Sequence, residues 1–138
     1  MENEVKSEVI ITEEKALKEL KGNYAKAQKV IDKPDKLNEI LLKAESKFKT
    51  VPCVGEALSY VPVLISMVRS YIKKEYFEFP IGTVVAIVSA LIYLVSPVDL
   101  IADVIPIVGY ADDAAVILAC YKLIESDVKE YIAWRDNK

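Results

Sequence analysis

The sequence contains no histidine, and it has only four glycines and two cysteines among its 138 residues. Without histidine the chain lacks the most common general base and the most common zinc ligand, so Ser–His and Cys–His catalysis are excluded. Cys53 and Cys120 lie far apart and form no Cys-x-x-Cys motif. We therefore expect a reducing environment in which both cysteines are small buried hydrophobic residues.

Enzyme motifs and binding signals are missing as well. The sequence has no P-loop, no glycine-rich dinucleotide turn and no nucleophile elbow. Its basic residues are scattered and its net charge is −3, so a nucleic-acid-binding surface is not indicated. The acidic, polar start "MENEVKSEVIITEEK" is not a secretory signal peptide. These absences predict a protein that is not an enzyme, holds no cofactor and binds no nucleic acid.

What is present is helical periodicity. Apolar stripes at helical spacing predict a first helix from Thr12 to Ile31 and further helices opened by Pro34, Pro62 and Pro80. Strand-type alternation with hairpin turns is missing. The pattern predicts an all-α fold, a small bundle of about five to seven helices with a very apolar central hairpin.

Composition divides the chain near residue 50. Residues 1–50 are rich in lysine and glutamate and predict amphipathic lead-in helices, whose lysines we interpret as solvated faces. Residues 51–138 contain the apolar segments and predict the helical core. A chain of this length suits one domain, so we expect both parts to form a single compact unit.

The longest apolar run, residues 79–98, contains no charged side chain. About 20 apolar residues can span a bilayer as a helix, and Lys73, Lys74 and Tyr76 before the run are typical of a membrane boundary. The alternative is a central helix of a soluble bundle, which is also apolar on all sides. A second span directly afterwards would contain several aspartates, so one span or an interfacial hairpin is favoured.

Those aspartates lie in "SPVDLIADVIPIVGYADDAA", residues 96–115, and are Asp99, Asp103, Asp112 and Asp113. They are the only charged residues from Phe79 to Tyr121. An ionised carboxylate is costly to bury unless something compensates its charge. The stretch therefore requires an explanation for each aspartate.

Helix capping is the favoured explanation. In "SPVD" the serine can cap a short helix, with Pro97 at its first position and Asp99 reaching back to the cap. We expect Pro106 to lie where this short helix ends, and Asp112 or Asp113 to cap the final helix.

A metal site is the alternative explanation. Asp99 and Asp103 are four residues apart and share a helical face, while Asp112 and Asp113 follow a tight turn. Four carboxylates suit a hard cation such as Mg²⁺, Ca²⁺ or Mn²⁺. An ion pair between Asp103 and either Arg69 or Lys122 would explain that residue without a metal.

The stretch resembles the hallmark of the YkvA-type bacterial domain of unknown function, S-P-x-D-L-I-P-D-x-I-P-x-x-G-x-x-D-D, after an apolar helix. The residues that fall on this pattern are Ser96, Pro97, Asp99, Leu100, Ile101, Asp103, Ile105, Pro106, Gly109, Asp112 and Asp113. Ala102 departs from the pattern where proline is usual, and Ile81 departs where an aromatic residue is common. The resemblance implies a small helical protein, one that is often predicted to be in a membrane, and no known reaction.

Three functional hypotheses remain. The favoured one is a non-enzymatic protein of the cell membrane, with residues 79–98 in or at the bilayer and the N-terminal half in the cytoplasm, following the positive-inside tendency. The second is a soluble cytoplasmic interaction module that forms a homo-oligomer or binds a protein partner, as an immunity or regulatory factor does. The third is a protein that binds a divalent cation through the aspartate cluster.

Overall fold

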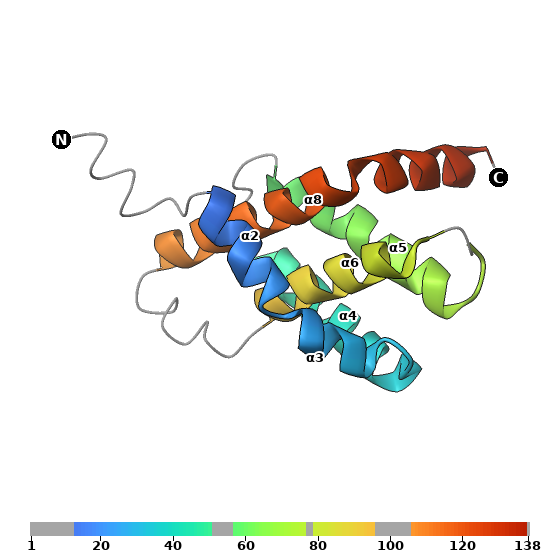
Figure 1. Cartoon of the computed structure of the whole chain (residues 1–138), viewed down its shortest axis with the longest axis horizontal. Coiled ribbons are helices and arrows are strands. Elements are labelled where there is room, and N and C mark those ends of the chain that lie inside the picture. Colours follow the sequence, from blue (N-terminus) through green and yellow to red (C-terminus); the bar gives the residue numbers. More distant parts are fainter. Residues whose placement is uncertain (1–12, 51–56, 77–78, 96–105, 138) are drawn as a thin grey trace.

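The computed structural model describes residues 13–50, 57–76, 79–95 and 106–137, and these residues contain helices and no strand (Figure 1). The α-helices are α2 (Glu13–Lys21), α3 (Tyr24–Val30), α4 (Pro34–Thr50), α5 (Val61–Ile72), α6 (Ile81–Leu94) and α8 (Pro106–Asp136), and the short 3-10 helix η1 spans Ala57–Tyr60. The predicted all-α class is therefore confirmed.

The first predicted helix is divided in two. The expectation of one helix as far as Ile31 is wrong, because α2 ends at Lys21 and α3 begins at Tyr24. At the break, the amide of Asn23 donates to the Leu20 carbonyl at 3.1 Å, and its side-chain amide donates to the Glu19 carbonyl at 3.0 Å. The residue directly before Asn23 is a glycine, which weakens a helix. The asparagine side chain competes for the backbone hydrogen bonds that would continue the helix. The expected Thr12 cap lies outside the described residues.

The prolines mark helix starts as predicted. Pro34 is the first residue of α4, Pro62 lies in the first turn of α5, and Pro80 directly precedes α6. Proline lacks the amide hydrogen that the first helical turn leaves unpaired, so it is well tolerated there. The predicted apolar stripe of α4 is also confirmed, because Leu37 and Leu41 are buried in the core.

Helix α6 is the central helix of the bundle. Every residue from Thr83 to Leu91 is buried, and the helix packs against α2, α3, α4, α5 and α8 (Figure 1, yellow). Its 14 residues give a length of about 21 Å, against about 30 Å for the apolar part of a bilayer. No helix within the described ranges combines the length and apolarity needed to cross a membrane. The expected spanning helix at 79–98 is therefore not supported, and the alternative of a helix buried on all sides describes α6.

The last helix begins earlier than predicted. Helix α8 starts at Pro106, so this proline opens a helix where we expected one to end. Asp112 and Asp113 consequently lie in the second turn of α8, and the prediction that one of them occupies its N-cap is wrong. Non-helical backbone angles at Ile124 (φ −119°, ψ 19°) divide α8 into two helical halves at a bend.

The lead-in helices are packed into the same core as α6. Ala16 and Leu20 of α2 and Ala27 of α3 belong to one buried apolar cluster with α6 residues such as Ile87. From α4, the Lys47 ammonium donates to the Leu94 carbonyl at 2.6 Å. A cation at this position is favourable, because the last carbonyls of a helix lack intrahelical partners and carry its negative dipole end.

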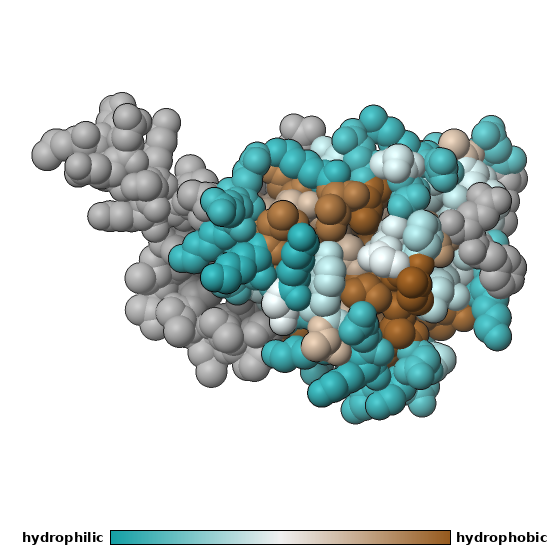
Figure 2. All heavy atoms as spheres, viewed as in Figure 1, coloured by the Kyte–Doolittle hydropathy of each residue, from teal (hydrophilic) through white to brown (hydrophobic). Residues whose placement is uncertain are grey.

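Figure 2 shows how polarity is distributed over one face of the molecule. Apolar side chains reach the surface in the middle of this face, and hydrophilic side chains surround them, densely along the lower edge where α3 and α4 lie. The lysine-rich outer sides of the lead-in helices are therefore exposed, as the sequence predicts.

Candidate functional site

A cavity of about 390 Å³ lies between α4, α5 and the second half of α8. Its volume falls within the range of small-molecule sites in proteins, which is about 300–1,000 Å³. Its lining residues are Glu45, Phe48, Pro62, Ile65, Ser66, Arg69, Ser70, Lys73, Glu75, Tyr131, Trp134 and Arg135. The wall thus combines cations, hydroxyl groups and aromatic rings.

A hydroxyl cluster forms the polar part of this wall. Tyr131 is almost fully buried, and its hydroxyl oxygen lies 2.6 Å from Ser66 Oγ and 2.9 Å from Ser70 Oγ. The Tyr131 hydroxyl also donates to the Ser66 carbonyl at 3.2 Å. A phenol has one proton and two lone pairs, so these contacts satisfy it. The cluster joins α8 to α5 at a fixed distance.

An ion pair between α4 and α5 lies beside the hydroxyl cluster. Two guanidinium nitrogens of Arg69 donate to the two carboxylate oxygens of Glu45, one of them at 3.0 Å. This hydrogen bonding raises the pKa of Arg69 above its usual value, against a smaller opposing effect of desolvation. A two-point Arg–carboxylate contact is geometrically specific, so it fixes the direction of the guanidinium plane.

Aromatic rings pack around the end of the cavity. Tyr76 lies 4.5 Å from Phe79, 5.6 Å from Tyr131 and 5.0 Å from Trp134, measured between ring centroids. The guanidinium carbon of Arg135 lies 5.8 Å from the centroid of Tyr131, within the range of a cation–π contact. Trp134 and Arg135 both line the cavity, and the exposed side chain of Arg135 lies at its rim.

The second half of α8 is also tied to the start of α6. The Thr83 hydroxyl donates to Asp127 Oδ2 at 2.5 Å, near the N-terminus of α6, where a negative charge is favourable. The predictions from the sequence did not include a contact between these two residues. Asp127, Tyr131 and Trp134 are spaced four and three residues apart, which places them on one helical face. That spacing is the signal that could have indicated this polar side of α8.

The predicted aspartate cluster is only partly within the described residues. Asp99 and Asp103 lie outside them, and Asp112 and Asp113 lie in α8, so the metal hypothesis for the four residues stays a prediction. In the ranges that the structure covers, no three or more metal-ligating side chains come together. The two cations considered as partners of Asp103 bind other carboxylates.

Each of these two cations pairs with a carboxylate on another helix. Arg69 pairs with Glu45, and the Lys122 ammonium lies 2.6 Å from a carboxylate oxygen of Glu13. The hydrogen bond with Lys122 lowers the pKa of Glu13. This surface contact links α2 to α8.

Only one of the two cysteines lies within the described residues. Cys53 lies outside the described residues, whereas Cys120 is buried with its Sγ 3.5 Å from the Ala86 carbonyl. Burial raises the pKa of the Cys120 thiol to about 12, so it stays protonated and unreactive near neutral pH. The expectation of a small buried hydrophobic residue is confirmed for Cys120.

Comparison with known proteins gives two matches. Residues 83–119 match a family model described as a protein of unknown function, DUF1232. The chain is also 30% identical to the uncharacterized membrane protein YkvA of Bacillus subtilis (strain 168) over 80 residues, which are 58% of this chain and 76% of that protein. No solved structure matches the chain significantly. All residues that line the cavity lie outside residues 83–119, so the matched segment does not include it.

Proposed function

Because the chain belongs to the YkvA-type family of proteins of unknown function, we propose that it is a small non-enzymatic helical protein that works at a membrane surface. The observation that carries this proposal is the similarity of the chain to YkvA, a membrane protein. In this proposal, the apolar centre of the protein is a hairpin formed by α6 and the first half of α8. The antiparallel arrangement of such a hairpin is supported by the contact of Cys120 with Ala86, and by the contact of Asp127, in the second half of α8, with Thr83 at the start of α6.

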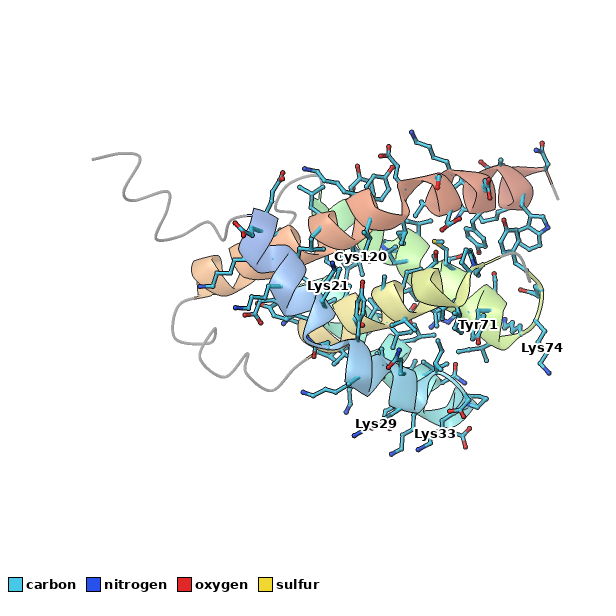
Figure 3. All side chains as sticks on the ribbon, viewed as in Figure 1. Lys21, Lys29, Lys33, Tyr71, Lys74 and Cys120 are labelled. Carbon is cyan, nitrogen blue, oxygen red and sulfur yellow. The ribbon has the colours of Figure 1, made fainter. Side chains whose placement is uncertain are left out.

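The lead-in helices offer a means of attachment. Residues 15–36 contain seven lysines and three acidic residues, a net charge of +4 in a chain whose total is −3. We call residues 15–36 the lysine-rich segment; its lysines are Lys15, Lys18, Lys21, Lys26, Lys29, Lys33 and Lys36. All seven are exposed, and Figure 3 shows Lys29 and Lys33 at the outer edge of the molecule.

Such a segment is suited to an anionic lipid surface. The cytoplasmic leaflet is negatively charged, and each lysine near it contributes about 1 kcal/mol of attraction. The helices need not enter the bilayer for this attachment, because the attraction acts over about one Debye length. We therefore propose that the N-terminal half faces the cytoplasmic leaflet of the cell membrane, with the buried helix α6 remaining inside the protein.

Co-sedimentation with vesicles tests this proposal. The purified protein is mixed with vesicles of phosphatidylcholine alone or with 30% phosphatidylglycerol, both in 50 mM and in 500 mM salt. We expect binding to the anionic vesicles at low salt, with most of it lost at high salt. A triple variant with Lys26, Lys29 and Lys33 replaced by glutamine should bind about 100-fold more weakly, following about 1 kcal/mol per lysine.

A matched control changes the same charge elsewhere. Replacing Lys43, Lys74 and Lys129 with glutamine removes three exposed lysines outside the lysine-rich segment. This control should retain binding within a few fold of the original protein. Equal loss in both triple variants would show non-specific attraction, and a protein that stays in the supernatant with every vesicle would contradict the proposal.

A further inference from the structure

We propose that the cavity between α4, α5 and α8 binds a small amphiphile that has a phosphate head group and a short apolar chain. The proposal goes beyond the membrane function, because the cavity is built from residues outside the lysine-rich segment and can be tested without any membrane. Its basis is the arrangement of charge, apolar surface and volume in the cavity wall.

Three cations at the cavity suit an anionic head group. Arg69 and Lys73 come from the last turn of α5 and its C-cap, and Arg135 comes from the last turn of α8. Glu45 occupies two of the five N–H donors of Arg69, so three donors stay available in a guanidinium whose direction is fixed. Two carboxylates, Glu45 and Glu75, also line the cavity, which leaves an excess of one positive charge.

The other two cations are accessible to a ligand. Within the described residues, the Lys73 ammonium has no carboxylate within ion-pair distance, and it is exposed at the rim. Arg135 lies over the Tyr131 ring, with its Nε 3.6 Å from a carboxylate oxygen of Asp136. Several donors that line the cavity from two helices match the three oxygens of a phosphate monoester better than the single charge of a ligand carboxylate.

The remaining wall is apolar and favours a short chain or ring. Phe48, Ile65 and Trp134 contribute apolar surface, and the hydroxyl cluster around Tyr131 is already satisfied within the protein. Because no side-chain polar atom buried in the described residues lacks a hydrogen-bond partner, an apolar group in this part leaves none unpaired.

The volume limits the size of the ligand. At about 30 Å³ per water-sized group, the cavity of about 390 Å³ holds roughly a dozen such groups. That number is enough for a phosphate and a chain of about six carbons, but not for a complete membrane lipid with two long acyl chains.

Tryptophan fluorescence offers a direct test. Trp134 is the only tryptophan of the chain and lines the cavity, so its emission reports on this site. The full-length protein is titrated with hexyl phosphate in the absence of vesicles. We expect a saturable change in emission, at least tenfold weaker binding of inorganic phosphate and of hexanol, and no saturable binding of hexyltrimethylammonium.

Variants at the rim test the role of charge. Replacing Lys73 and Arg135 with glutamine should weaken hexyl phosphate binding at least tenfold, and both positions are exposed, so circular dichroism and thermal melting should show an unchanged fold. Lys74→Gln is the matched control. Its side chain points away from the helices in Figure 3, it does not line the cavity, and its replacement should leave binding unchanged.

One further ligand distinguishes the sources of the phosphate. Tighter binding of 1-acetylglycerol 3-phosphate, a single-chain lipid analogue close in size to hexyl phosphate, than of hexyl phosphate would assign the site to lipid head groups, and the reverse order would assign it to soluble phosphate esters. Equal binding of hexanol and hexyl phosphate, equal losses in Lys74→Gln and the rim variant, or no saturable change with any phosphate would overturn the proposal. None of these results depends on vesicle binding, so the two proposals fail separately.

Discussion

The two halves of α8, on either side of the bend at Ile124, contact the rest of the protein by different kinds of interaction. The first half lies along α6 and buries apolar side chains such as Val116, Ile117 and Cys120. The second half buries Val128 as well, but it is also fixed by hydrogen bonds, from Thr83 to Asp127 and between Tyr131 and two serines of α5.

Because of this difference, we expect the first half to contribute mainly to the stability of the fold and the second half to the shape of the cavity. Apolar burial is non-directional and roughly proportional to area, so the first half can contribute much stability with little constraint on orientation. Hydrogen bonds are directional, and they hold the second half at the distance from α5 that leaves the cavity open. We therefore expect substitutions in the first half to change the free energy of unfolding most, and substitutions in the second half to change the cavity.

The largest expected effect is in the first half. Ile117→Ala removes a fully buried side chain beside α6 and should lower the free energy of unfolding by about 2–5 kcal/mol, as large-to-small core changes do. Urea unfolding monitored by circular dichroism measures the loss. The adjacent Leu118 is only half-buried, so Leu118→Ala should cost clearly less. Equal losses at both positions would contradict the packing described for this half.

Tyr131→Phe should have the next largest effect on the free energy of unfolding. It leaves the hydroxyls of Ser66 and Ser70 without their shared partner, and an unpaired buried hydroxyl costs about 1–3 kcal/mol. Adding Ser70→Ala should restore part of the loss. Tyr121→Phe is the control, because its ring stacks on Tyr60 at 3.8 Å and its hydroxyl has no hydrogen bond among the described residues. The same urea experiment would reject the hydroxyl cluster if Tyr121→Phe cost as much.

The link between Thr83 and Asp127 should show a smaller, specific coupling. In a double-mutant cycle with Thr83→Val and Asp127→Asn, we expect a coupling energy of about 1–2 kcal/mol, because the bond joins a hydroxyl to a carboxylate. Glu130→Gln makes the same charge change at an exposed site of α8 and should show no coupling with Thr83→Val. A coupling near zero for Asp127 would remove this contact from the account of the second half.

The effect that is smallest at neutral pH concerns Cys120, because its thiol changes the free energy of unfolding only in alkaline solution. Burial raises the pKa of its thiol from 9.0 to about 12, so above pH 9 the unfolded chain loses this proton while the folded chain retains it. This contribution to stability is therefore fully present below pH 9 and is lost as the pH rises toward 12.

Urea unfolding of the original protein and of Cys120→Ala at pH 7, 8 and 10.5 measures this term. The difference in unfolding free energy between the two proteins should be constant from pH 7 to 8 and should shift against the original protein at pH 10.5. Cys53 is present in both proteins, so its titration cancels in the difference. A constant difference across all three pH values would show that Cys120 is reached by water.

The sequence was informative where local chemistry decides the structure. Proline at helix starts and the apolar stripe of α4 depend on a few neighbouring residues, and these predictions are confirmed. The break at Asn23 was also a local signal, a glycine followed by an asparagine, but the continuous apolar stripe outweighed it in the prediction.

Tertiary context decided the features that were missed. Gly109 is unfavourable in a helix by propensity, yet α8 begins at Pro106 and continues through Gly109, which moved its start away from Asp112. The cavity could not be predicted, because α8 is far from α4 and α5 in sequence and no motif joins Glu45, Arg69 and Tyr131. A charge-free run such as residues 79–98 also has the same composition whether it lies in a bilayer or in a protein interior, because both environments are apolar.

The contact between α2 and α8 has a consequence for how the chain folds. Glu13 pairs with Lys122, and α2 packs along α8, so helices near opposite ends of the sequence are neighbours in the fold. Contacts of such long sequence separation slow folding, because much of the chain must be ordered before they form. During synthesis, Ala16 and Leu20 of α2 would leave the ribosome long before their neighbours in α8, and would stay exposed to chaperones until α8 had been made.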